Sequence, residues 1–202
     1  MAKVLLYYAH PGARYSRVNS EMQRRASEVD GITRVDLYAR YPRHKIDIDA
    51  EQGLLRDHEI IVFQFPLFWY STPSIIKEWQ DLVLEHGFAY GTGGTELAGK
   101  SMMLACTAAG PEDAYRPEGY QHFPLRTFLS PLEQTARLCQ MHFLAPYVLY
   151  SSLKAPDTGD VAPHAEGFVR LLGALRDNRY DTDRAAKLDI VTATTLPMLA
   201  EA

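Results

Sequence analysis

The stretch Val4-Leu5-Leu6-Tyr7-Tyr8-Ala9-His10-Pro11-Gly12 contains six apolar residues in a row and then a loop signal. A short, fully apolar run is typical of a strand that is buried on both faces, as the central strands of a parallel sheet are. Two further runs repeat the pattern. Residues 60–65 end at Pro66, and residues 101–107 lead into a loop of small residues. We therefore expect three central strands, each followed by a loop.

The segments between these runs show helical periodicity. Val18, Met22, Ala26 and Val29 recur at helical spacing, and Ser16 stands where it can cap the helix start. The clearest helix spans residues 73–86, where five apolar residues form one stripe (Ile75, Ile76, Trp79, Leu82 and Val83). We also predict an edge strand over residues 32–38, a fourth core strand over 143–151, and helices over 49–58, 124–138 and 161–178.

Strands alternate with helices from end to end, and the chain has no repeat or linker. This order predicts one α/β domain, a doubly wound and mainly parallel sheet with helices on both faces. We assign residues 1–180 to this domain. Residues 181–202 form a tail that periodicity does not place.

Composition narrows the classes of function. The chain has 202 residues, 47% hydrophobic and 23% charged, and a net charge of −4, which argues against nucleic-acid binding. Its two cysteines lack CxxC spacing and its seven histidines lack metal spacing, so we expect neither a disulfide framework nor a metal site. The apolar run at residues 4–9 is too short to span a bilayer and lacks a cleavage site, so we expect a cytoplasmic protein.

One motif is misleading. Residues 94–101 match the phosphate-binding pattern GxxxxGK[ST] letter for letter. A working P-loop follows a strand and opens a helix, whereas here a helix and a loop precede the motif and a strand is expected after it. We predict a loop that enters a strand. A nucleotide triphosphatase is kept only as a third hypothesis, which Lys100→Ala would test.

Ligands of open α/β sheets bind beyond the carboxyl ends of the strands. Three loops qualify here: residues 10–19, 66–72 and 107–122. The first offers His10, Ser16 and Asn19 around a helix N-terminus, which suits a phosphate monoester. The alternative is a plain helix cap beside a solvated histidine.

The second loop, Pro66-Leu67-Phe68-Trp69-Tyr70-Ser71, would form an aromatic shelf for a flat ring. The alternative is core packing or a dimer contact. The third loop, Thr107-Ala108-Ala109-Gly110, is small enough for a ring to approach its backbone, and Tyr115 and His122 beyond it are candidate proton donors. The alternative is two ordinary polar loop residues. Taken together, the three loops describe a site for a flat phosphorylated cofactor such as flavin mononucleotide (FMN).

The same residues carry a resemblance to a known family. The matching stretches are Ala9-His10-Pro11 with Ser16 and Asn19, Tyr41-Pro42 with Ile46-Asp47-Ile48, Pro66 to Tyr70 with Pro73 and Trp79, and His86-Gly87-Phe88-Ala89-Tyr90-Gly91 with Gly93-Gly94. They resemble the flavodoxin-like NAD(P)H:quinone oxidoreductases. Within that family they are most similar to the KefF/KefG-type ancillary subunits of glutathione-gated potassium-efflux systems. The resemblance runs from about residue 3 to about residue 178.

The resemblance implies a flavodoxin-like fold, a bound flavin and usually a homodimer with the site at the interface. It also implies ping-pong hydride transfer from NAD(P)H through flavin N5 to a quinone or similar electrophile. FMN is expected rather than FAD, because the chain lacks the long C-terminal extension of larger members. An alternative role is an ancillary subunit that binds and activates a potassium-efflux membrane protein, with peripheral association at the inner face of the cell membrane.

The resemblance assigns roles to individual residues by position. His10, Ser16, Arg17, Val18 and Asn19 would hold the phosphate and ribityl chain. Pro66, Leu67, Phe68, Trp69 and Tyr70 would hold the isoalloxazine, and Thr107, Ala108, Ala109 and Gly110 would approach its pyrimidine edge. Tyr115 and His122 would hydrogen-bond the flavin edge and act as the catalytic pair.

The chain departs from the family at two places in this site. Phe68 stands where members often carry Gln, and Ala108-Ala109-Gly110 replaces the last three residues of Thr-Thr-Gly-Gly. We expect Phe68 to keep a backbone N–H for the flavin, and we expect a lower cofactor affinity than is usual. His122 is displaced by about one residue from the family's histidine.

Overall fold

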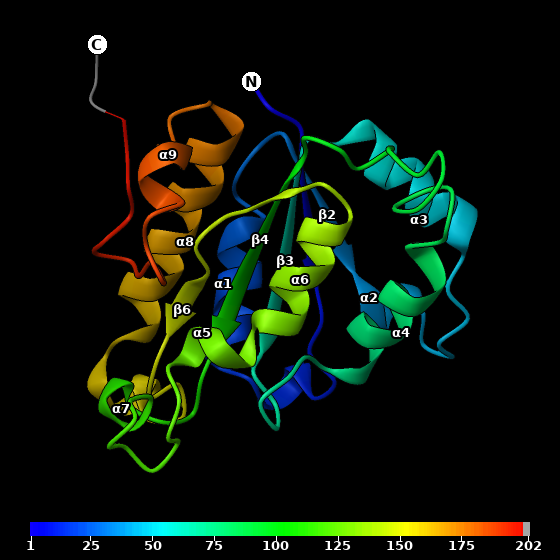
Figure 1. Ribbon diagram of the computed structural model, residues 1–202. Coiled ribbons are helices and arrows are strands. Elements are labelled where there is room, and N and C mark those ends of the chain that lie inside the picture. The colour runs from blue at the N-terminus through cyan, green and yellow to red at the C-terminus, as the bar shows by residue number, and fades with distance from the viewer. Residues whose placement is uncertain (200–202) are drawn as a thin grey trace.

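The computed structural model describes residues 1–199. Within them lies a parallel sheet in the order β2-β1-β3-β4-β5, with β6 also paired to β4 (Figure 1). The strands are β1 (Val4–Tyr8), β2 (Ile32–Asp36), β3 (Ile60–Pro66), β4 (Ser101–Thr107), β5 (His142–Phe143) and β6 (Tyr147–Leu149). The prediction of a doubly wound α/β fold is confirmed.

The helices cover both faces of the sheet. Figure 1 shows α1 (Val18–Ala26) and α8 (Val161–Arg176) on one side, and α3 (Ile48–Asp57) and α4 (Ser74–Val83) on the other. Successive strand residues point to opposite faces, so each face has its own apolar core. The remaining helices are α2 (Leu37–Arg40), α5 (Leu125–Phe128), α6 (Ser130–Leu138), α7 (Ala155–Thr158) and α9 (Thr182–Ala185), with 3-10 turns at Ala13–Tyr15 and Glu112–Ala114.

Several predicted boundaries were wrong, and each has a local cause. The edge strand stops at Asp36 because the Asp36 carboxylate accepts from Ala39 N–H at 3.0 Å and caps α2. The helix predicted over 124–138 is two helices, since Leu129 ends α5 and Pro131 lies in the first turn of α6. The strand predicted over 143–151 divides into β5 and β6 around Pro146, which has no N–H for the ladder.

A buried carboxylate, which periodicity did not predict, stands in one of the two cores. Glu51 of α3 is fully buried and accepts from the Tyr7 hydroxyl at 2.5 Å, the Tyr41 hydroxyl at 2.6 Å and Trp79 Nε1 at 2.9 Å. Arg40 Nε lies 3.2 Å from it. The carboxylate therefore joins β1, α3 and α4. Burial, together with the Glu51 charge, raises the pKa of Tyr7 well above its usual value.

The P-loop look-alike forms a loop that enters a strand, as predicted, because β4 begins at Ser101. Lys100 donates from Nζ to the backbone oxygen of Arg56 at 2.9 Å and to that of His58 at 2.6 Å. Its ammonium group thus binds carbonyls at the end of α3, where a helix leaves such groups unsatisfied.

The segment that periodicity left unplaced packs against the sheet edge. Val191 is buried beside Tyr147 of β6, accepts from Val148 N–H at 2.9 Å and donates to Pro146 O at 2.8 Å. Tyr180 and Met198 form an antiparallel bridge. Across residues 1–199, none of the helices combines the length and the apolar character needed to cross a membrane.

Candidate functional site

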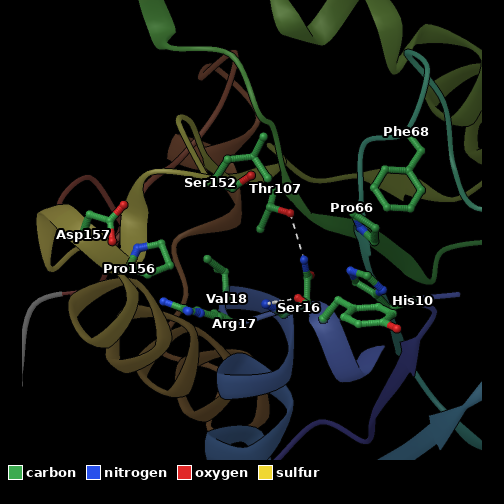
Figure 2. Close-up of a pocket in the computed structure, with 13 residues that line it drawn as sticks. His10, Ser16, Arg17, Val18, Pro66, Phe68, Thr107, Ser152, Pro156 and Asp157 are labelled. Atoms are coloured by element: carbon green, nitrogen blue, oxygen red, sulfur yellow. Dashed lines mark hydrogen bonds between the residues drawn. The ribbon is translucent and has the colours of Figure 1, made fainter. Parts of the chain in front are cut away.

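The loops that follow β1, β3, β4 and β6 meet at one end of the sheet. Leu67 N–H donates to Thr107 O at 2.9 Å, Ala108 N–H donates to Leu149 O at 2.8 Å, and Ser152 N–H donates to Ala108 O at 2.9 Å. These bonds connect the second, third and fourth loops. A cavity of about 490 Å³ lies among the four loops (Figure 2).

The cavity gathers residues that are far apart in the sequence. Eight of the predicted site residues line it: His10, Ser16, Arg17, Val18, Asn19, Pro66, Phe68 and Thr107. The lining also contains Tyr15, Ser152, Leu153, Pro156 and Asp157, which the sequence reasoning missed. Four of these five follow β6. The sequence predicts this strand, so extending the carboxyl-edge rule to the loop after residue 151 would have marked them.

One end of the cavity is formed by the start of α1. Ser16 Oγ accepts from Asn19 N–H at 3.1 Å, as predicted for a capping residue. In Figure 2 the Arg17 side chain extends from this helix start toward Pro156 and Asp157. A helix N-terminus and a guanidinium group favour an anion. Asp157 adds a negative charge at the margin of the same end.

His10 connects the first loop to the second. Its Nδ1 accepts from Gly12 N–H at 3.1 Å, so the neutral ring carries its proton on Nε2. Burial lowers the pKa of His10, which favours this neutral form. Its ring meets Phe68 edge to face, with centroids 5.7 Å apart. His10 is thus a neutral hydrogen-bond donor held next to an aromatic ring.

The aromatic shelf is a tight turn. Phe68 and Ser71 exchange two backbone hydrogen bonds at 3.0 and 2.9 Å, and the residues between them have positive φ, 47° at Trp69 and 65° at Tyr70. Bulky residues rarely adopt this conformation. Because Phe68 N–H is bonded to Ser71, the expectation that it remains free for a flavin was wrong. Trp69 is 92% exposed at the tip of the turn.

Tyr115 and His122 occupy different settings. Tyr115 is buried, with its ring 5.5 Å from Tyr150 and 6.1 Å from Phe128 between centroids, and burial raises its pKa, so the hydroxyl keeps its proton. His122 is exposed and has a φ of 61°. Neither lines the cavity, nor do the remaining predicted residues: Leu67, Trp69, Tyr70, Ala108, Ala109 and Gly110. Their roles stay predictions.

Comparison with known proteins places this geometry in context. A family model for the flavodoxin-like fold matches residues 2–170. A glutathione-regulated potassium-efflux system ancillary protein KefG, from Cronobacter sakazakii, is 46% identical over 171 residues, which cover 85% of this chain and 92% of the relative.

Three solved structures are also similar. General stress protein 14 of Treponema denticola, in complex with FMN, has a TM-score of 0.81 and 34% identity, covering 86% of this chain and 99% of that one. A Klebsiella pneumoniae putative quinone reductase has a TM-score of 0.76 and 27% identity. The match covers 90% of this chain and 89% of that one. A protein described as a tryptophan halogenase of S. violaceusniger has a TM-score of 0.78 and 40% identity. The match covers 81% of this chain and 95% of that one. The described activities differ, so likeness of fold does not by itself select a reaction.

Proposed function

The chain belongs to the flavodoxin-like fold family, and on that premise we propose that it is an FMN-dependent NAD(P)H:quinone oxidoreductase. The observation that carries the proposal is the cavity, which has an anion-binding helix start at one end and Phe68 and His10 at the other. The FMN complex of the Treponema denticola protein and the Klebsiella pneumoniae quinone reductase support it, since both have this fold at more than 25% identity.

The residues present fit the cofactor. The start of α1 and Arg17 suit the phosphate, and Ser16 fixes the first turn of that helix. Asn19 Oδ1 is buried and has no hydrogen-bond partner within residues 1–199, which suits a ligand that brings hydroxyl donors, as a ribityl chain does. Phe68 of the aromatic turn offers a ring for stacking at the opposite end.

The protein would contribute position and polarity. When bound, FMN would supply the two-electron chemistry, accepting a hydride from NAD(P)H and passing it to a quinone or similar electrophile. His10 would donate from Nε2 at neutral pH. The protonated Tyr115 hydroxyl and the exposed His122 are the proposed catalytic donors at the edge of the site.

The same end of the molecule carries most of the exposed large hydrophobic side chains. Among the described residues, seven of the eleven lie on these loops: Tyr15, Phe68, Trp69, Tyr70, Tyr120, Phe123 and Leu153. Such a concentration is typical of a surface that another chain covers. We therefore include a homodimer in the proposal, with the site at its interface. Sedimentation equilibrium would measure twice the monomer mass.

The experiment is a visible absorption spectrum after incubation with FMN and desalting. We expect a retained flavin band that bleaches with NADPH and returns with menadione. Phe68→Ala should weaken flavin retention. Leu138→Ala, which truncates an exposed side chain on α6, serves as the control. A colourless wild-type protein would contradict the proposal.

A second function is favoured by the KefG relative, which is named as an ancillary protein of a potassium-efflux system. The chain would bind a Kef-type membrane protein peripherally and activate it. Potassium efflux from cells that carry the membrane protein, with and without this chain, tests the idea. His122→Ala should abolish reductase activity while efflux activation persists. An efflux rate that this chain does not change would contradict the role.

A further inference from the structure

A buried glutamine lies behind the cavity and takes no part in its lining. Gln64 is in β3, two residues before Pro66, and its side chain is 0% exposed. Its Nε2 donates to the backbone oxygen of Asn19 at 2.9 Å. Asn19, which is 2% exposed, donates in turn from Nδ2 to Thr107 Oγ1 at 2.9 Å. The chain of bonds runs from β3 through α1 to the end of β4.

This chain of polar groups is costly to bury. Within residues 1–199, Gln64 Oε1 and Asn19 Oδ1 have no hydrogen-bond partner. A buried acceptor without a partner loses its hydrogen bonds to water and gains none in return, and native proteins keep few such acceptors. A methionine at position 64 would fill similar volume without this cost. Stability alone therefore does not explain the glutamine.

The direction of the bonds has a consequence at the cavity. Because Thr107 Oγ1 accepts from Asn19, the hydroxyl proton of Thr107 points away from Asn19, and within residues 1–199 it remains free for another acceptor. Asn19 Oδ1 remains an acceptor. Asn19 and Thr107 are both lining residues of the cavity, so a donor and a buried acceptor without a partner lie next to each other at its wall. An alcohol can bind both groups, since its hydroxyl accepts from Thr107 and donates to Asn19 Oδ1.

We propose that Gln64 is a positioning residue for the polyol chain of the cofactor. It holds the Asn19 backbone in place, and through Asn19 it sets the orientation of the Thr107 hydroxyl. This inference rests on the proposed flavin site but concerns a residue that does not touch the ligand. It predicts that Gln64 governs affinity for the ribityl portion and leaves the phosphate contacts of Arg17 and the α1 start unchanged.

The test is fluorescence titration of the apoprotein with FMN and with riboflavin. Gln64→Met should raise the Kd for both ligands by the same factor, roughly tenfold for one lost positioning contact. Its midpoint of urea unfolding should not fall below that of the wild type. Gln52→Met is the matched control: Gln52 is also a buried glutamine, but it binds Val83 O and Glu85 at a distance from the cavity. Its flavin Kd values should match the wild type.

The variant Gln64→Glu adds a pH signature. A carboxylate at this position would face the Asn19 carbonyl and repel it, whereas the protonated acid would donate as the amide does. Burial raises the pKa of a carboxyl group, so the change falls in an accessible range. The ratio of the variant Kd to the wild-type Kd should therefore decrease toward one as the pH is lowered from about 8 to about 5.

The outcomes are distinct. A wild-type protein that binds neither flavin overturns the proposed function, and this role with it. If the wild type binds and Gln64→Met binds within twofold of it, the positioning role is wrong. If Gln64→Met weakens the binding of FMN but not of riboflavin, the residue acts on the phosphate, and the polyol assignment is wrong. A Gln64→Glu ratio that is independent of pH would rule out the hydrogen bond to Asn19 as the cause.

Discussion

His164 is a buried titratable residue whose protonation opposes folding. The residue is 2% exposed, and within residues 1–199 neither ring nitrogen has a hydrogen-bond partner. Its ring stacks on Tyr147 with centroids 4.5 Å apart, and the Tyr147 hydroxyl donates to its backbone oxygen at 2.6 Å. Burial lowers the pKa of His164 from 6.5 to about 4, so the folded protein keeps it neutral.

This pKa shift makes stability depend on pH in a defined direction. Below the ordinary histidine value of 6.5, the unfolded chain binds a proton that the folded chain rejects until about pH 4, so stability falls as the pH is lowered through this window. The loss from this residue is about 2 kcal/mol at pH 5. Urea unfolding of wild type and His164→Phe should show the variant gaining that amount, relative to wild type, between pH 7 and pH 5. An unchanged difference would contradict a neutral buried His164.

Two glycines in the loop after α4 are needed for different reasons. Gly94 has no room for a Cβ, whereas Gly93 has room but a left-handed backbone. A Cβ at Gly94 would stand 2.1 Å from Tyr90 O, whereas one at Gly93 would meet no atom within 4 Å, although φ there is +78°. Gly94→Ala should therefore cost several kcal/mol, since backbone must move. Gly93→Ala should cost about 1 kcal/mol for its left-handed backbone. Thermal unfolding measures both, and equal losses would contradict the clash.

At the scale of elements, Lys100 connects the end of α3 to the start of β4. Desolvation lowers the pKa of its ammonium group, which still donates to two carbonyls. Lys100→Met should lower the free energy of unfolding by roughly 1–3 kcal/mol, as hydrogen bonds from charged groups do. Lys77→Met removes only an exposed pair with Asp81 and should cost under about 1 kcal/mol.

Lys100→Met also tests whether the P-loop look-alike at residues 94–101 binds ATP. Lys100 is engaged with backbone carbonyls and β4 follows directly, so we expect no ATP binding by wild type or by Lys100→Met in equilibrium dialysis. ATP binding that the substitution abolishes would restore the triphosphatase hypothesis.

At the scale of the whole molecule, residues 180–199 pack against the edge of the sheet. Val191 is fully buried against β6, whereas Leu199 is 46% exposed. Val191→Ala should destabilise the protein by roughly 1–3 kcal/mol, because it removes two buried methyl groups and leaves a cavity. Leu199→Ala should change stability by less than about 0.5 kcal/mol. Similar losses for both, measured by urea unfolding, would contradict the packing of this segment.

The fold class and most of the central strands followed from local patterns. Apolar runs such as residues 4–9 and 101–107 predict buried parallel strands wherever they occur, and the topology rule then places the site at the carboxyl edge. His10, Ser16, Asn19, Phe68 and Thr107 were found in this way, because each lies at or just beyond the carboxyl end of a strand or at the start of α1. Strand ends and helix starts depend on residues that are adjacent in the chain, so they can be predicted from the sequence.

Contacts between distant segments could not be predicted in the same way. The bonds of Gln64 to Asn19 and of Asn19 to Thr107 span 45 and 88 residues, and no periodicity encodes such pairs. Periodicity also does not encode the hydrogen bonds that Glu51 accepts from Tyr7, Tyr41 and Trp79. Nor does it encode the position of Asp157 at the cavity or of Val191 beside β6. Their roles depend on direction and distance across packed elements, and these are set only when helices and strands from the whole chain come together.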